Sequence, residues 1–222
     1  MIFRDRHDAG RHLATRLKQY AGRPEVMVLA LPRGGVPVAY EVAAQLGVPL
    51  DIFLVRKLGV PGLEELAMGA IASGGVRVIN QDVVRHLNIS PEMIEAVAAE
   101  EQRELERRQR EYRGDQPSPE VKGRTIILID DGLATGSTMR AAASALREKE
   151  PARIVVAVPV SAAETCEHFQ DEVDEIVCAV TPEPFQGVGL WYEDFTQTTD
   201  EEVGELLERA RQQTKHALSH SP

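Results

Sequence analysis

The most regular feature of the chain is a series of short apolar runs that are rich in β-branched side chains. Runs of this kind are typical of strands that are buried on both faces, as in a parallel sheet. They predict strands at residues 25–31, 50–55, 125–129, 153–158 and 175–180. Helical periodicity is found at residues 5–20, 36–45, 90–113, 139–149, 162–170 and 201–211. Because strands alternate with helices, the pattern predicts an α/β fold with a doubly wound, mainly parallel sheet.

Two signals add to this outline. The pair Gly74-Gly75 lies between two short apolar runs and predicts a β-hairpin over residues 70–79, because glycine readily adopts positive φ. The predicted helix at residues 90–113 begins with the capping residue Ser90 and is charged on nearly every side. Only a thin apolar seam runs along it, so it either packs along that seam or serves as an arm for dimerisation.

One stretch, RTIILIDDGLATGST at residues 124–138, combines a strand, two acids, a small-residue turn and the start of a helix. Asp130 and Asp131 follow the strand directly, where carboxylates suit ribose hydroxyls or a Mg²⁺ shared with a ligand. The turn that follows contains Ala134, Thr135, Gly136, Ser137 and Thr138. Small residues let backbone N–H groups converge, and the helix adds the positive end of its dipole, which together suit a phosphate. The stretch therefore predicts a sugar-phosphate site.

A second strand-turn-helix unit carries the glycine turn LPRGG. Gly34 and Gly35 allow backbone amides to approach an anion closely, and Arg33 supplies a cation that can make bidentate contacts. Arg56 and Lys57 follow a third predicted strand, whose carboxyl end lies on the same rim, so they are assigned to the same anion. The simpler alternatives are a plain turn with an exposed arginine and ordinary surface cations.

Composition narrows the function classes. The 25 basic and 35 acidic residues give a net charge of -10, which is the wrong sign for a protein that mainly holds nucleic acid. Cys166 and Cys178 lack CxxC or Cys/His spacing and indicate neither a disulfide framework nor a zinc site. The charged segment at residues 1–13 does not resemble a signal peptide, and no run approaches a membrane span. We expect a cytoplasmic protein with small-molecule partners and no nucleic-acid or membrane partner.

The motif ILIDDGLATGST and the turn LPRGG resemble the signatures of type I phosphoribosyltransferases, which bind 5-phosphoribosyl 1-pyrophosphate (PRPP). The resemblance extends over about residues 26–180. It implies a single domain over residues 1–222, with a core at about 24–79 and 124–180, an inserted helical arm at about 80–123 and a small hood from about 1–23 and 181–199. The arm departs from compact members of the family. We also expect a homo-oligomer, a dimer.

The resemblance implies an enzyme that transfers 5-phosphoribose to a nitrogenous base, most simply a purine-like one, and releases pyrophosphate with Mg²⁺. It assigns ribose 5-phosphate to Asp130, Asp131 and the turn from Ala134 to Thr138, and Mg²⁺ to the two aspartates. It assigns pyrophosphate to Arg33, Gly34, Gly35, Arg56 and Lys57. In this family the pyrophosphate turn often holds a strained or cis peptide bond.

Glycine and proline punctuate residues 58–70, LGVPGLEELAMGA, and predict a mobile loop. In the resembling family a flexible loop closes here and keeps water away from an oxocarbenium-like state. Glu64 and Glu65 lie on this loop, and one of them could accept the proton of the attacking nitrogen. Together with Arg56 and Lys57 they are the catalytic candidates, and solvated surface carboxylates are an equally good interpretation of the two glutamates.

The sequence says less about the identity of the acceptor base. The aromatic segment TPEPFQGVGLWYEDF is similar to the carboxyl-terminal segment with which hypoxanthine-guanine enzymes stack a purine, and Phe185 is the best stacking candidate. Ala134 stands where the hypoxanthine-guanine enzymes carry an aspartate. The motifs ATG and VRKLGVPG instead resemble the adenine branch of the family. The identity of the acceptor base therefore stays open. The main alternative function is a non-catalytic sensor of PRPP with the same fold.

Overall fold

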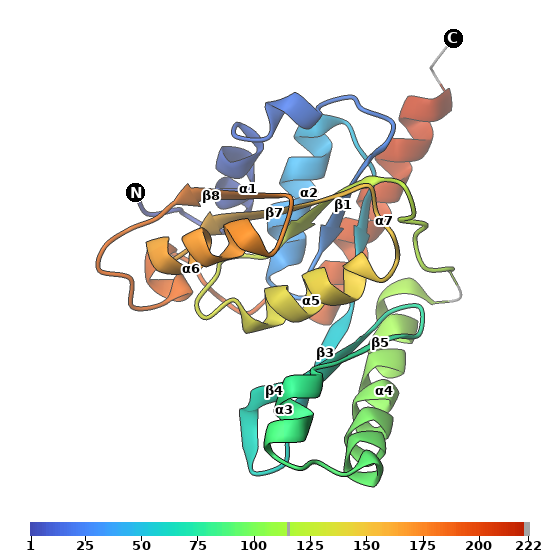
Figure 1. Ribbon diagram of the computed structural model, residues 1–222. Helices are drawn as coiled ribbons and strands as arrows, with labels where there is room; N and C mark the ends of the chain where they lie inside the picture. The colour runs from blue at the N-terminus through green and yellow to red at the C-terminus, as the bar shows by residue number, and fades with distance from the viewer. Residues whose placement is uncertain (115, 220–222) are drawn as a thin grey trace.

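The computed structural model describes residues 1–114 and 116–219, apart from the side chains of Glu65 and residues 215–219. Within these residues five parallel strands form one sheet in the order β2-β1-β6-β7-β8 (Figure 1). The strands are β1 Val26–Ala30, β2 Leu50–Ile52, β6 Thr125–Ile129, β7 Arg153–Val160 and β8 Glu175–Val180. The α/β fold with a parallel sheet is therefore confirmed.

Burial on both faces explains why these strands are continuous apolar runs. In β6, Ile127 and Ile129 pack into the hydrophobic cluster on one face of the sheet. Ile126 and Leu128 point to the opposite face, because successive side chains of a strand alternate. All four side chains are fully buried.

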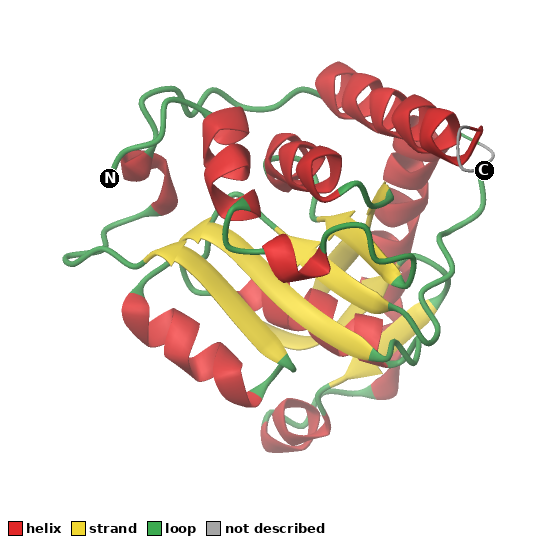
Figure 2. Ribbon diagram, turned by 90° about the horizontal axis from the view of Figure 1, so that it is seen from above, coloured by secondary structure: helices red, strands yellow, loops and turns green. Residues whose placement is uncertain are grey.

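Helices cover both faces of the sheet (Figure 2). The first face carries α1 Arg6–Ala14, α2 Gly35–Leu46 and α7 Asp200–Ser219, and the second carries α5 Ser137–Arg147 and α6 Ala163–His168. Short 3₁₀ turns are found at Lys18–Tyr20, Phe169–Asp171 and Val188–Trp191. Gly47 closes α2 in a left-handed conformation, as its position after the helix predicts. Helix α7 extends beyond the predicted residues 201–211.

The strand order reverses direction between β1 and β6. The chain leaves β1 through α2 on one face of the sheet, and leaves β6 through α5 on the other. Ala30 pairs with Ile129, so both strands end at the same level. Ligands of open α/β sheets bind in the crevice at such a switch point.

A smaller lobe contains a second, antiparallel sheet formed by β3 Val55–Val60, β4 Leu63–Ala72 and β5 Val76–Ile79. The predicted hairpin around Gly74-Gly75 is confirmed, since Ala72 pairs with Val76. The strand predicted at residues 50–55 is confirmed over Leu50–Ile52 only, because the chain leaves the parallel sheet there and enters the second sheet at Val55. Residues 58–70 do not form the irregular loop that was expected, because β3 pairs with β4 along most of this segment, and the mobility of the segment stays a prediction.

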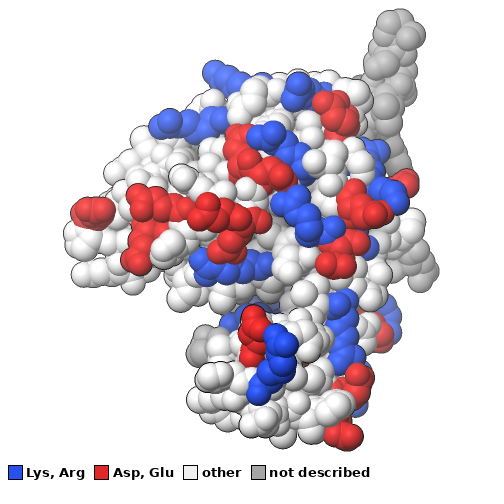
Figure 3. Space-filling view, in the orientation of Figure 1, with Lys and Arg blue, Asp and Glu red and all other residues white. Residues whose placement is uncertain are grey.

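Helices α3 Gln81–His86 and α4 Pro91–Arg113 complete the smaller lobe. Ser90 Oγ accepts a hydrogen bond from Met93 N and caps α4, as predicted. The apolar seam of α4 is buried through Ile94, Ala98, Leu105 and Tyr112. The helix therefore packs along its seam against the rest of this chain. A groove lined by β4, β5 and α5 separates the two lobes on the face shown in Figure 3.

Cys166 of α6 and Cys178 of β8 form a disulfide. This differs from the expectation that the cysteines are not paired. The sequence spacing carried no signal, because the two residues meet only when α6 folds back onto β8. Among the helices that the structure describes, none has the length and apolar character needed to cross a membrane.

Candidate functional site

Asp130 and Asp131 lie at the switch point, directly after β6. The backbone N–H of Asp131 donates to Asp130 Oδ1 at 2.8 Å. Burial raises the pKa of the Asp130 carboxyl well above its ordinary value, and the neighbouring Asp131 carboxylate raises it further. Burial also raises the pKa of Asp131, although the Arg6 guanidinium opposes this shift. Two partly buried carboxylates side by side create a strong local demand for a cation or for hydroxyl donors.

Arg6 meets part of this demand from the amino-terminal helix. Its Nε donates to Asp131 Oδ2 at 2.8 Å, and its Nη1 donates to Thr196 O at 2.7 Å. Its guanidinium also stacks 4.0 Å from the ring centre of Phe195. The hydroxyl of Tyr192 donates to Asp131 O at 2.6 Å. The amino-terminal helix and the segment around Tyr192 thus both contact Asp131.

The sequence did not identify Arg6 or Tyr192 as site residues. Arg6 is one of several charged residues near the amino terminus, and nothing in its spacing points to a partner 125 positions away. Tyr192 lies in the aromatic segment that the sequence did single out, although for base stacking rather than for support of the acids.

Gly34 and Gly35 let α2 begin against the acidic pair. A Cβ at Gly34 would lie 2.1 Å from Asp131 Oδ2. A Cβ at Gly35 would lie 2.7 Å from Ile129 O and 2.9 Å from Asp130 Cα. The two glycines are therefore required for close approach between the turn after β1 and the acids. The peptide bond between Pro32 and Arg33 is cis.

Helices α2 and α5 both point their amino termini at this crevice. They begin at Gly34 and Gly136, neither of which provides a side-chain cap. In contrast, α1, α3 and α4 begin with the capping side chains of Asp5, Asn80 and Ser90. In α2, however, the N–H groups of Gly35 and Val36 already donate to Leu31 O and Arg33 O. In α5 the N–H of Ser137 makes only a long contact of 3.4 Å with Thr135 Oγ1, so the amino terminus of α5 is the better placed of the two to bind an anion.

The turn from Ala134 to Thr138 is supported from outside the motif. Thr165 Oγ1 donates to Ala134 O at 3.0 Å, and Arg140 Nη1 donates to Thr135 O at 2.8 Å. Gly136 has φ +71° and lies against the ring of Phe169, where a Cβ would come within 2.6 Å. The turn is thus held in shape by α5, α6 and the segment after α6.

Two of the predicted cations, Arg56 and Lys57, lie in a different element from the one expected. Arg56 and Lys57 lie in β3 of the antiparallel sheet, so their placement at the carboxyl end of a parallel strand is wrong. Lys57 Nζ still lies 3.5 Å from Ser137 Oγ of the phosphate turn. Arg56 Nε binds Glu101 Oε2 at 2.5 Å, and Arg33 Nη1 lies 3.8 Å from Asp200 Oδ1. The smaller lobe therefore places Lys57 next to the turn that follows β6, at the carboxyl-end rim of the parallel sheet.

Glu64 lies near the far end of the β3–β4 hairpin, away from the parallel sheet (Figure 1). It is exposed, and its Oε1 accepts a hydrogen bond from Gly62 N at 3.0 Å. Backbone hydrogen bonds lower the pKa of its carboxyl, which makes it a weaker base. The side chain of Glu65 lies outside the described residues. The catalytic assignment of these two residues stays a prediction.

Phe185 is half-buried and packs against a small cluster that contains Phe3, Val160 and Tyr192. Trp191 packs against the same cluster, and its indole nitrogen is buried. The aromatic segment therefore covers the crevice side of the sheet next to the acidic pair. Whether Phe185 contacts a base stays a prediction.

The raised pKa of Asp130 has a consequence for stability. A carboxyl whose pKa is higher in the folded state loses folding free energy as pH rises above about 3.9, the unfolded value. Asp130→Asn should therefore raise the melting temperature at pH 7 by about 2 to 4 °C, or about 1 kcal/mol for a chain of this size. The difference from the wild type should shrink as pH falls through the raised pKa of Asp130 toward about 4, because the protonated carboxyl is uncharged like asparagine.

Thermal melting of both proteins between about pH 4 and pH 8 checks this expectation. Asp194→Asn is the control, because this exposed carboxyl has its pKa lowered by hydrogen bonds from Thr196. The control should give no increase in melting temperature at any pH. A melting temperature of Asp130→Asn at or below that of the wild type at pH 7 would show that the charge of Asp130 is fully compensated.

Comparison with known proteins identifies the family. The family model described as phosphoribosyl transferase domain matches residues 3–192. A Mycobacterium tuberculosis (strain H37Rv) protein named "Putative phosphoribosyl transferase" is 47% identical over 209 residues, which cover 94% of this chain and 47% of that protein. The chain thus spans about half the length of this curated relative.

Two further proteins are similar to the chain. The crystal structure of TT1426 from Thermus thermophilus is 42% identical, with a TM-score of 0.86, and the match covers 94% of this chain and 99% of that chain. The bifunctional protein PyrR of Chloroflexus aurantiacus is 33% identical over 138 residues, which cover 57% of this chain and 65% of that protein. These matches confirm the resemblance seen in the sequence motifs, and the chain belongs to the phosphoribosyl transferase family.

Proposed function

We propose that the protein is an enzyme that transfers 5-phosphoribose from PRPP to a nitrogenous base and releases pyrophosphate. The observation that supports this most strongly is the convergence at one switch point of two partly buried carboxylates, the amino terminus of α5 and the glycine turn before α2. A sugar that carries a phosphate at one end and a pyrophosphate at the other presents hydroxyls between two anions. In the crevice, the turn from Ala134 to Thr138 would match the phosphate, the two carboxylates would match the hydroxyls, and the turn with Gly34 and Gly35 would match the pyrophosphate.

In this proposal the turn from Ala134 to Thr138 binds the 5-phosphate through backbone N–H groups and hydroxyls. Asp130 and Asp131 accept hydrogen bonds from the ribose hydroxyls. Pyrophosphate lies between the turn with Gly34 and Gly35 and the cations of β3. A nitrogen of the base then bonds to the anomeric carbon as the carbon-oxygen bond to pyrophosphate breaks. Pyrophosphate leaves with the electron pair, and the proton of the nitrogen passes to a general base, for which Glu64 and Glu65 are the predicted candidates.

The donor set also fits Mg²⁺, which takes oxygen ligands and is usually bound through one or two carboxylates together with substrate phosphates. Asp130 and Asp131 would hold it. When bound, the ion neutralises charge on the pyrophosphate as it leaves. No group of three or more His, Cys, Asp or Glu side chains that could hold a metal ion is found within the described residues. We propose that Mg²⁺ binds together with PRPP, because Mg²⁺ commonly takes ligands from substrate phosphates as well as from carboxylates.

A screen of nucleobases and other amines for pyrophosphate release from PRPP tests the proposal. Pyrophosphate release that depends on one base would support an enzyme and identify the acceptor. Binding of PRPP without turnover across the whole screen would favour a non-catalytic sensor. If the wild type fails to bind PRPP with Mg²⁺, the proposed function is wrong.

Phe185 is proposed to stack on the acceptor base. Phe185→Ala should raise the KM for the acceptor by roughly 5- to 150-fold, since a base-aromatic stack contributes about 1 to 3 kcal/mol. The affinity for PRPP should stay nearly unchanged. Steady-state kinetics with varied acceptor, together with calorimetric titration of PRPP, measures both quantities.

Leu190→Ala is the matched control, because Leu190 lies in the same segment with 63% of its surface exposed and should leave the acceptor KM unchanged. The melting temperature of each variant must be measured, since Phe185 also packs against Phe3 and Tyr192. An unchanged acceptor KM in a folded Phe185→Ala protein would make Phe185 a packing residue only.

A further inference from the structure

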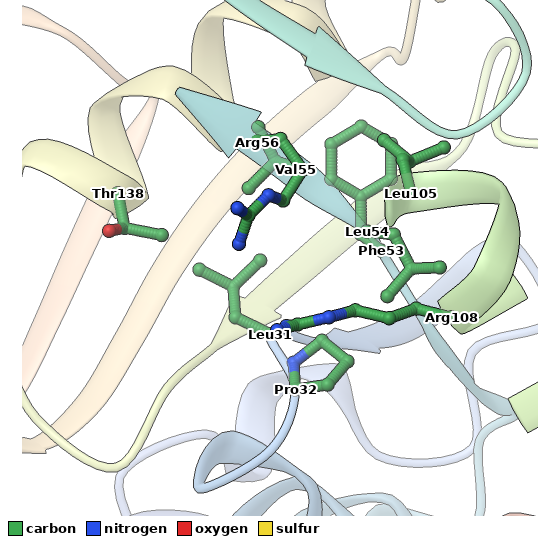
Figure 4. Close-up of a pocket in the computed structure, with 9 residues that line it drawn as sticks. All are labelled: Leu31, Pro32, Phe53, Leu54, Val55, Arg56, Leu105, Arg108 and Thr138. Carbon is green, nitrogen blue, oxygen red and sulfur yellow. The ribbon is translucent and has the colours of Figure 1, made fainter. Parts of the chain in front are cut away.

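A small cavity of about 30 Å³ lies where the two lobes meet. Four segments line it: the end of β1 with the pyrophosphate turn, the entry into β3, and the helices α4 and α5. The lining residues are Leu31, Pro32, Phe53, Leu54, Val55, Arg56, Leu105, Arg108 and Thr138 (Figure 4). Three of the four segments belong to the site described above, and the fourth is the inserted helix α4.

Arg108 is the charged residue that α4 contributes to this cavity. Figure 4 shows its side chain running from α4 toward Leu31 and Pro32, while the guanidinium of Arg56 points into the same region. Arg108 binds Glu104 Oε1 through Nε at 2.7 Å. A guanidinium carries five N–H donors in a fixed fork, so this one contact leaves it able to bind an anion as well.

The same helix also holds the other cations at this end of the site. Glu101 binds Arg56 directly. Tyr112 donates its hydroxyl to Asp200 Oδ1 at 2.5 Å, and Asp200 in turn lies 3.8 Å from Arg33. Helix α4 therefore provides one cation and controls, directly or through Asp200, the position of two more. A solvated arm would make none of these contacts.

We propose that Arg108 of the inserted helix is a pyrophosphate-binding residue, so that the insertion completes the leaving-group end of the site. The inference rests on the proposed function, because it places pyrophosphate beside Pro32 and Arg56 at the mouth of this cavity, whose own volume of about 30 Å³ is that of about one water molecule. In the ligand-free protein Glu104 and Glu101 neutralise Arg108 and Arg56. Pyrophosphate, which carries more charge than a carboxylate, replaces these glutamates as the partner of the two arginines.

Arg108→Gln and Arg107→Gln form a matched pair of variants that tests this assignment. Both arginines bind Glu104, but Arg107 also binds Glu111, has 53% of its side chain exposed and does not line the cavity. Calorimetry would measure the binding of pyrophosphate, of PRPP and of ribose 5-phosphate, each with Mg²⁺. Arg108→Gln should weaken the binding of pyrophosphate and PRPP about 10-fold or more, the loss of one hydrogen bond to a charged group.

Ribose 5-phosphate should bind Arg108→Gln as it binds the wild type, and Arg107→Gln should bind all three ligands normally. Arg108→Lys should restore part of the lost affinity, because it keeps the charge without the planar fork. Unchanged pyrophosphate binding by Arg108→Gln, or an equal loss for all three ligands, would overturn the assignment of Arg108 and leave the proposed function intact. A wild type that binds neither pyrophosphate nor PRPP would overturn both.

Discussion

Replacing both Asp130 and Asp131 with asparagine should reduce Mg²⁺-dependent binding of PRPP by more than about 100-fold, since two anionic partners of the ribose and the metal are lost. The effect should be larger than that of any other change at the site. Both carboxylates are partly buried at the switch point, and asparagine keeps their size while it removes their charge. Calorimetric titration of PRPP with and without Mg²⁺ measures the loss.

The single variants distinguish the effect of losing a charge on PRPP binding from its effect on stability. Asp130→Asn should raise stability at pH 7, whereas Asp131→Asn should lower it, because Arg6 is then left with 10% of its side chain exposed and no anionic partner at Asp131. Adding Arg6→Gln to Asp131→Asn should recover part of that loss without recovering PRPP binding. If the double aspartate variant bound PRPP within about twofold of the wild type, the acidic pair would not be the ribose and metal site.

Gly35→Ala should lower the free energy of unfolding by about 1 to 3 kcal/mol, which is the usual cost of adding a methyl group where no room exists. The new Cβ would lie 2.7 Å from Ile129 O and 2.9 Å from Asp130 Cα, and backbone atoms cannot rotate away. Relief requires α2 to move from the acidic pair, so PRPP affinity should fall as well. Urea unfolding and calorimetry measure the two effects.

Gly204→Ala is the control for this experiment. Gly204 lies inside α7, and a Cβ added there would meet no atom within 4 Å. The substitution should stabilise the protein by up to about 1 kcal/mol through helix propensity. A Gly35→Ala protein as stable as the wild type would show that the close approach of α2 to β6 is not needed for the fold.

The parallel sheet was predictable because its strands are apolar on both faces. β6 and β8 have the boundaries that the sequence predicts, and β1 and β7 differ by a few residues at their ends. The start of α4 at Ser90 and the end of α2 at Gly47 were also predictable, because capping and positive φ are local properties. The candidate phosphate turn and acidic pair were visible as a motif for the same reason.

The antiparallel sheet was not predictable from local pattern. Residues 55–72 contain Gly59, Pro61 and Gly62, which are typical of a loop, yet strand pairing orders the segment. Cross-strand hydrogen bonds depend on a partner strand, and that partner is defined by the folded chain rather than by its neighbours in sequence. The roles of Arg56 and Lys57 changed with it, from the end of a parallel strand to the side of the second sheet.

The fold class, the two glycine turns and the acidic pair could be predicted from local sequence, because each depends on residues that are close together along the chain. Which distant side chains meet at the candidate site depends on how the chain folds. Arg6 reaches Asp131, Asp200 approaches Arg33, and Arg108 enters the cavity beside Pro32. Each contact joins elements that are separated by long stretches of chain, and charged side chains carry no pattern that names their partner.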